Sequence, residues 1–164
     1  MREILFKAKR LDNGEWVEGY YVKTTLGTDI KPSDVIFVPF KISRNEEWGW
    51  MKIDPTTLCQ YTCLNDKNGR KIWENDILRG HGNDEDLVKV VFGKFNAIDV
   101  ETLEIVDNVI GWNTEVIATD ALSKCEPFCL PMPLTDFYIK LCEYEVVGNV
   151  FDGGFDDSKE TKEN

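Results

Sequence analysis

The chain has 164 residues, an apolar content of 42% and a net charge of −11 at neutral pH. A chain of this length can bury a core of its own, so its fold needs neither a metal ion nor a disulfide for stability. No apolar run approaches the roughly 20 residues of a membrane helix. The charged N-terminal segment lacks the apolar core of a signal peptide, and we expect a cytoplasmic protein. Its acidity argues against the basic surface that binds phosphate groups.

The first third of the chain is predicted to form short strands. Residues 4–6 and 16–22 are rich in strand-forming side chains, and Asn13 and Gly14 between them form a pair that favours a tight hairpin turn. A further strand is expected over residues 35–38.

Two tryptophans, Trp48 and Trp50, follow in a segment that also reads as a strand. Because side chains alternate along a strand, the two indoles would share one face. Such a pair could stack on bases or sugars, but aromatic residues more often pack in a core or at the edge of an oligomer interface. The structural interpretation is therefore favoured.

The middle of the chain contains a second predicted hairpin, because Asn68 and Gly69 again form a turn pair between two short apolar runs. Strands in this part are expected at residues 60–62, 71–73 and 87–92 and as a strand pair within residues 95–112. A polar loop, residues 79–86, separates the hairpin from the later strands. Short strands with turns about every ten residues are typical of a small barrel or sandwich.

One helix is predicted near the C-terminus, just after two prolines that suit a helix start. Its apolar stripe, which we expect to face the core, consists of Leu134, Phe137, Tyr138, Leu141 and Cys142. A last strand is expected over residues 144–151. The charged tail, residues 152–164, is expected to be disordered. It contains five acidic and two basic residues, so most of the net charge belongs to the rest of the chain.

Three blocks of the sequence resemble the YopX family of phage and prophage proteins: residues 2–8, the segment from Gln60 to Ile77, and residues 144–150. The resemblance implies a phage or prophage origin, a mainly β fold with an SH3-like small barrel at its centre, and no assigned biochemical activity. We therefore expect one YopX-like β domain over residues 1–151, with the barrel core at about 58–112. Additional β-hairpins and one short helix before the last strand complete this predicted fold.

This chain departs from the family's usual second block at two positions, where Cys63 and Asn75 stand in place of glycines. Asparagine is the non-glycine residue that best tolerates a left-handed backbone, so the change at Asn75 is mild. Cys63 is the larger departure. It implies that this position accepts a side chain here, and it argues against a thiol chemistry shared by the family.

Four of the five cysteines form two pairs whose spacing zinc permits, namely Cys59 with Cys63 and Cys125 with Cys129. If residues 59–63 form a strand, the first two would lie about 13 Å apart, too far for one metal ion. We therefore expect no metal and no cofactor. The odd number of cysteines also favours reduced thiols over a disulfide framework.

No arrangement of residues points to catalysis, and we do not expect an enzyme. The single histidine, His81, lies between glycines and near no nucleophile signature. Carboxylates that could bind magnesium or transfer protons gather near one predicted hairpin, at Asp99, Glu101, Glu104 and Asp107. In so acidic a chain, a solvated strand face explains them better.

The favoured hypothesis is a phage accessory protein that acts by contact with an unknown host or phage protein and self-associates as a homo-oligomer. It rests on five tryptophans and several apolar strands, because aromatic side chains commonly anchor interfaces. The alternatives are a nucleic-acid-binding barrel and an acidic mimic of nucleic acid that occupies a host DNA-binding protein. The candidate contact residues for a partner or nucleic acid are Arg70, Lys71, Trp48, Trp50 and Trp73.

Overall fold

The computed structural model describes residues 3–27, 30–39, 49–99, 102, 104–117 and 131–153. The chain divides into two compact units, unit 1 (Met1–Cys63) and unit 2 (Leu64–Asn164). A single folding domain over residues 1–151 stays a prediction. Within the expected tail, Asp152 belongs to a 3-10 helix, and residues 154–164 lie outside the described residues.

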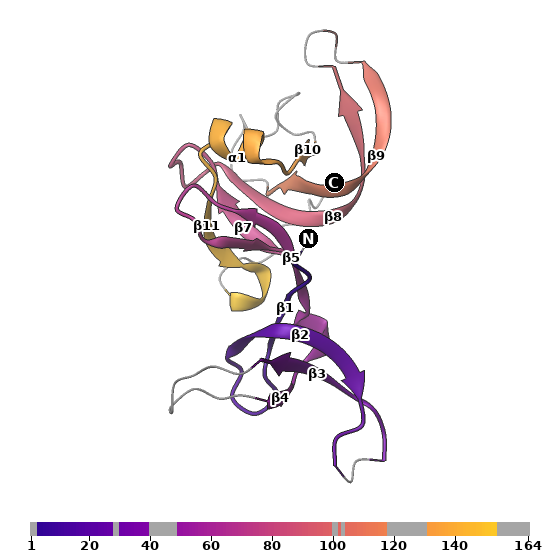
Figure 1. Ribbon diagram of the computed structural model, residues 1–164. Coiled ribbons are helices and arrows are strands. Elements are labelled where there is room, and N and C mark those ends of the chain that lie inside the picture. The colour runs from indigo at the N-terminus through magenta and orange to yellow at the C-terminus, as the bar shows by residue number, and fades with distance from the viewer. Residues whose placement is uncertain are drawn as a thin grey trace, which may run out of the picture. The chain divides into compact units, whose positions relative to one another are not determined.

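Unit 1 is built on an antiparallel sheet with the strand order β4-β3-β2-β1-β5 (Figure 1). The strands are β1 (Phe6–Lys9), β2 (Trp16–Thr24), β3 (Ser33–Val38), β4 (Gly49–Lys52) and β5 (Cys59–Asn65). A short 3-10 helix, η1 (Pro55–Thr57), connects β4 to β5, and β5 continues into unit 2. These strands confirm the short β elements predicted for the first third of the chain.

The predicted turn between β1 and β2 is present. Gly14 has a φ of +75°, a left-handed conformation that a residue without a Cβ adopts at no steric cost, and its N–H donates to the Arg10 carbonyl at 3.0 Å. The two strands then pair in register from Lys9 with Trp16 to Phe6 with Gly19. Ala8, Ile36 and Ile53 form one buried apolar cluster of unit 1.

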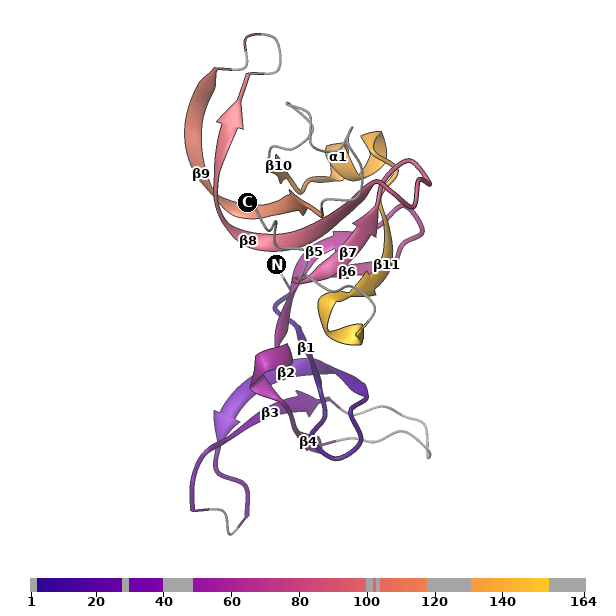
Figure 2. The same ribbon diagram turned by 180° about the vertical axis from the view of Figure 1, so that it is seen from behind.

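Unit 2 is built on a second antiparallel sheet, with the strand order β10-β9-β8-β7-β11 (Figure 2). Its strands are β7 (Asp76–Arg79), β8 (Leu87–Ile98), β9 (Ile105–Val116), β10 (Met132–Pro133) and β11 (Glu145–Asn149). Strand β6 (Lys71–Trp73) turns back on the end of β5, helix α1 (Asp136–Leu141) lies between β10 and β11, and η2 (Val150–Asp152) ends the described chain. The mainly β fold with one short helix before the last strand is thus confirmed.

The expected barrel is not closed. Over the described residues, the outer strands β10 and β11 do not pair with each other, so the sheet of unit 2 is open. The barrel core at about 58–112 stays a prediction, and its residues belong to two sheets. Residues 59–73 pair in the first sheet, whereas β7, β8 and β9 belong to the second. The SH3-like arrangement stays a prediction.

Strands β8 and β9 are longer than the predicted strands of this region. The interruption expected after residue 92 does not occur, because Gly93 continues β8 and lies directly opposite Gly111 of β9. The two strands pair from Val88 with Val116 to Ile98 with Ile105, with one register shift near the far end.

The helix is shorter than its apolar stripe predicted, and its buried face is different. It begins at Asp136, after the N-cap residue Thr135, and its buried residue is Ile139. The expected core-facing stripe is wrong at Phe137 and Leu141, which are 67% and 57% exposed. Residues two positions apart are rotated by about 200° around a helix, so burying Ile139 turns Phe137 and Leu141 outward.

The core of unit 2 lies between the sheet and α1. It contains Ile72, Leu78, Val88, Val90, Leu134, Ile139, Tyr144 and Val146, with Cys142 packed against it as predicted. None of the helices described is long and apolar enough to cross a membrane.

Candidate functional site

The second and third sequence blocks meet in unit 2 through the carboxylate of Asp66. One carboxylate oxygen accepts the backbone N–H groups of Asn68 at 2.8 Å and Arg70 at 2.9 Å, which closes the predicted turn. The other accepts the N–H of Val146 at 3.0 Å. Asp66 is 6% exposed, so a buried carboxylate with three backbone donors fixes the turn against β11.

A second contact between the same blocks involves Asp76 and Asn149, which face each other across β7 and β11. The Asn149 amide donates to one Asp76 carboxylate oxygen at 2.9 Å, and the N–H of Trp73 donates to the other at 2.8 Å. Both side chains are 1% exposed. The polar residues that make these blocks recognisable therefore bind the backbone and each other.

Next to this junction, Glu145 accepts from several donors at the surface. Its carboxylate pairs with Arg79, and it also receives the Asn68 amide at 3.3 Å and lies 3.4 Å from the Lys67 ammonium nitrogen. The Arg79 guanidinium, the strongest of these partners, lowers the pKa of Glu145. Arg79 is also paired with Asp84. This ion-pair network links β7, β11 and the Asp66 turn.

The predicted basic contact residues lie beside this network. The Arg70 guanidinium donates to the Val146 carbonyl at 3.2 Å, and the Lys71 ammonium lies 5.5 Å from the centre of the Trp73 ring. Trp73 is 3% exposed, so its ring is buried and is not available to stack on a base. The candidate contact surface thus retains Arg70 and Lys71 in unit 2 but not Trp73.

The other two predicted contact residues belong to unit 1. Trp48 lies outside the described residues. Trp50 is on β4 and is 48% exposed. Its ring packs against Phe37 of β3, with 4.8 Å between the ring centres and a 43° tilt. The structure therefore does not bring Trp50 together with Arg70 and Lys71 within one unit.

The cysteines of the first pair both lie on β5 but in different surroundings. Cys59 is fully buried and its thiol donates to the Thr57 carbonyl, whereas the Cys63 thiol donates to the Glu3 carbonyl at 3.1 Å. Cys125 and Cys129 lie outside the described residues. Within the described part, no three histidine, cysteine or acidic side chains gather as metal ligands would.

The remaining candidates for chemistry have local structural roles. The His81 backbone N–H donates to the Cys142 carbonyl at 2.8 Å, and His81 has a φ of +49° in the loop after β7. At the end of β8, the Asp99 carboxylate accepts the N–H of Thr102 at 3.0 Å. Glu101 lies outside the described residues, and Glu104 and Asp107 are exposed.

An apolar surface that the sequence did not predict lies on the outer part of β8 and β9. We call residues 91–98 and 105–112 the arm. Its exposed apolar side chains are Phe92 (54%), Ile105 (59%), Val106 (67%) and Ile110 (63%). Phe92 packs edge-on against Trp112, with 5.0 Å between ring centres. Phe92 and Ile110 project from one face of the arm, whereas Ile105 and Val106 are consecutive and project from opposite faces. The alternation of these residues predicted strands but not which side chains would be uncovered.

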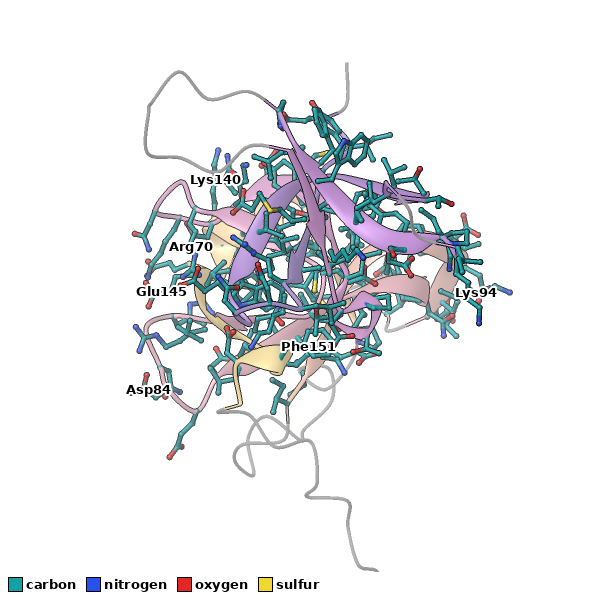
Figure 3. All side chains as sticks on the ribbon, turned by 90° about the horizontal axis from the view of Figure 1, so that it is seen from below. Arg70, Asp84, Lys94, Lys140, Glu145 and Phe151 are labelled. Atoms are coloured by element: carbon teal, nitrogen blue, oxygen red, sulfur yellow. The ribbon has the colours of Figure 1, made fainter. Side chains whose placement is uncertain are left out.

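The arm extends beyond the rest of unit 2 (Figure 1). Strand β7 pairs with β8 only as far as Lys89, and β10 pairs with β9 only at Asn113 and Thr114. At the base of the arm, Trp112 packs against the core of unit 2 and its carbonyl accepts the Leu134 N–H at 3.0 Å. Beyond that base, within the described residues, the two arm segments pair only with each other. Figure 3 shows Lys94, which lies on the arm, on the opposite side of unit 2 from Arg70 and Glu145. The arm is thus a surface distinct from the ion-pair network.

These features describe a mainly β protein whose recognisable sequence blocks are joined by buried structural hydrogen bonds. The family model described as YopX protein matches residues 5–154. Because this match covers most of the chain, the protein belongs to the YopX family, and the resemblance seen in the three blocks is confirmed. No curated protein matches the chain.

Proposed function

We propose that this protein is a non-enzymatic phage or prophage accessory protein that acts by protein contact and self-associates as a homo-oligomer. Its site of action would be the cytoplasm of the bacterial host. The observation that carries the proposal is the arm of unit 2, where exposed apolar side chains lie on a two-stranded ribbon. Exposed apolar surface of this kind is typical of interaction sites.

The structure of the arm supports this proposal in two ways. A two-stranded hairpin without further support is only marginally stable in water, and a partner that covers it would supply the missing packing. In addition, an uncovered strand edge offers backbone groups to another chain. Phe92 and Ile110 would be anchors of such a contact, because large apolar side chains contribute most when they leave water completely.

A concentration series measured by light scattering tests the oligomer directly. We expect a mass that rises to a fixed multiple of the monomer mass. Ile110→Asn should raise the dissociation constant by about tenfold or more, because burial of one large aliphatic side chain contributes about 1.5–3 kcal/mol. Leu11→Asn is the matched control, since Leu11 is a 65% exposed aliphatic residue of unit 1. A monomer at all concentrations would contradict the homo-oligomer.

The acidic mimic of nucleic acid is a second candidate function, favoured by the net charge of −11. It requires a host DNA-binding partner that co-purifies with the tagged protein after nuclease treatment and is released by high salt. A partner retained at high salt would instead favour apolar contact through the arm.

A further inference from the structure

Three aromatic side chains form a row across the sheet of unit 1. Tyr20 of β2 is directly opposite Phe37 of β3, and Phe37 is directly opposite Trp50 of β4. Directly opposite residues project from the same face of a sheet. Tyr20 and Trp50 are 45% and 48% exposed. The aromatic row thus presents two half-exposed rings, with Phe37 between them.

The same face carries more positive than negative charge. Alternation along the strands places Lys7 and Lys9 of β1 and Lys52 of β4 on it, and Glu18, directly opposite Lys7, is its only acidic residue along β1 to β4. Lys7 is buried, so the accessible ammonium groups of this face belong to Lys9 and Lys52. The ammonium groups of Lys7 and Lys9 lie 4.8 Å and 5.4 Å from the centre of the Trp16 ring. Lys52, two residues after Trp50 on β4, is exposed. A local cationic face therefore exists on a strongly acidic chain.

We propose that the aromatic row and its lysines bind single-stranded nucleic acid, with one base on Tyr20, one on Trp50, and the phosphates near the lysines. Exposed rings next to cationic side chains are the combination that proteins use to hold single strands without sequence preference. Neighbouring strands lie about 4.8 Å apart, so about 10 Å separates the two outer rings. Phe37 lies between them, and each base would therefore stack on the face of Tyr20 or Trp50 that points away from Phe37. This activity is separate from the contact proposed for the arm.

The charge of the face favours a nucleic acid over an apolar peptide. A base has an open ring face only when it is unpaired, so the site distinguishes single strands from duplexes. The binding should also depend on salt, because lysine contacts release counterions from the phosphates. Few lysines are involved, and this dependence should therefore be shallow.

Fluorescence anisotropy of a labelled twelve-nucleotide oligothymidylate, titrated with the full chain at low salt, tests the proposal. We expect Trp50→Ala and Tyr20→Ala each to weaken binding by about fivefold or more, the loss typical of one base stack. Trp50→Phe, which keeps a ring, should lose less. Phe137→Ala is the matched control, because Phe137 is a 67% exposed aromatic residue of unit 2, and it should bind like the unchanged protein.

Two further measurements distinguish this proposal from general charge attraction. Lys52→Gln should reduce the slope of log affinity against log salt by about 0.7, and a duplex of the same length should bind less tightly. No binding at low salt, equal weakening by Phe137→Ala and Trp50→Ala, or tighter binding of a proline-rich peptide would each overturn the proposal. Thermal unfolding of every variant, followed by circular dichroism, verifies that a loss of affinity is not a loss of fold.

Discussion

The side-chain amide of Asn149 donates a 2.9 Å hydrogen bond to a carboxylate oxygen of Asp76, and both residues are almost fully buried. The same amide group also donates to the Glu74 carbonyl at 3.3 Å, and the side-chain oxygen of Asn149 accepts the N–H of Phe151. One side chain thus joins β7, β11 and the start of η2. A buried polar group of this kind is costly to leave without its partner.

We therefore predict that Asn149→Ala lowers the free energy of unfolding by about 2–3 kcal/mol, because it removes a donor from a buried carboxylate and an acceptor from a helix start. Urea unfolding followed by tryptophan fluorescence measures the change. Asp84→Asn is the control, since the Asp84 side chain is 86% exposed and its pairing with Arg79 should contribute less than about 1 kcal/mol. Equal effects of the two substitutions would contradict a special role of the buried pair.

Cys63 and Asn75, at the two positions where the family resemblance leads us to expect glycine, both have left-handed backbones, with φ of +68° and +62°. A side chain in this conformation costs about 1–2 kcal/mol. Cys63→Gly should therefore stabilise the protein, by up to about 1 kcal/mol after loss of the thiol contact with Glu3 and gain of unfolded-state entropy.

The matched control for this substitution is Asn65→Gly, at an exposed position of the same strand with an ordinary negative φ. There, added backbone freedom should destabilise by about 0.5–1 kcal/mol. Thermal unfolding of the two variants under reducing conditions should shift the midpoint in opposite directions. A fall for Cys63→Gly as large as that for Asn65→Gly would show that the thiol contact outweighs the backbone strain.

A glycine is required at position 19 because the neighbouring strand β3 approaches its Cα closely, not because of its φ angle. A Cβ at this position would lie 2.3 Å from the Phe37 carbonyl oxygen and 2.9 Å from a side-chain carbon of Ile36. Because a backbone atom cannot move aside cheaply, Gly19→Ala should destabilise by about 2 kcal/mol or more. Gly93→Ala is the control, since a Cβ there meets no atom within 4 Å. Chemical unfolding of both variants should separate them clearly.

The ion pair between Arg79 and Glu145 predicts a pH dependence of stability. The pKa of Glu145 is lowered in the folded protein, chiefly by its hydrogen bonds from Arg79. A carboxyl of this kind contributes stability that is present above its unfolded pKa, about 4.3, and is lost as the pH falls through the lower folded pKa. We therefore expect the melting temperature to decrease as the pH drops below about 4.

Glu145→Gln should have a smaller drop in melting temperature between about pH 6 and pH 3 than the unchanged protein, because the titrating carboxylate is gone. Glu115→Gln provides the comparison, since Glu115 forms an exposed pair with Lys89 at 3.3 Å. An identical pH profile for Glu145→Gln and the unchanged protein would show that the Arg79 pair does not contribute to the acid sensitivity.

Local signals in the sequence predicted local structure well. The turn pairs Asn13 with Gly14 and Asn68 with Gly69 lie in hairpins, and Gly14 and Gly69 have the left-handed backbone, with φ of +75° and +82°, that glycine adopts at no steric cost. The helix shows the limit of such signals. Its stripe has the correct period, but the short helix buries Ile139 and exposes Phe137, because the packing partner sets which side faces inward.

The sequence by itself determined the mainly β composition, the hairpin turns and membership of the YopX family, since each depends on residues close together in the chain. The tertiary structure decided that Asp76 meets Asn149, that the predicted contact residue Trp73 is buried, and that Tyr20, Phe37 and Trp50 align. These outcomes depend on strand order and register between distant segments. A shift of one residue in the pairing of a strand would move all its side chains to the opposite face of the sheet. The sequence of one strand alone does not specify this pairing.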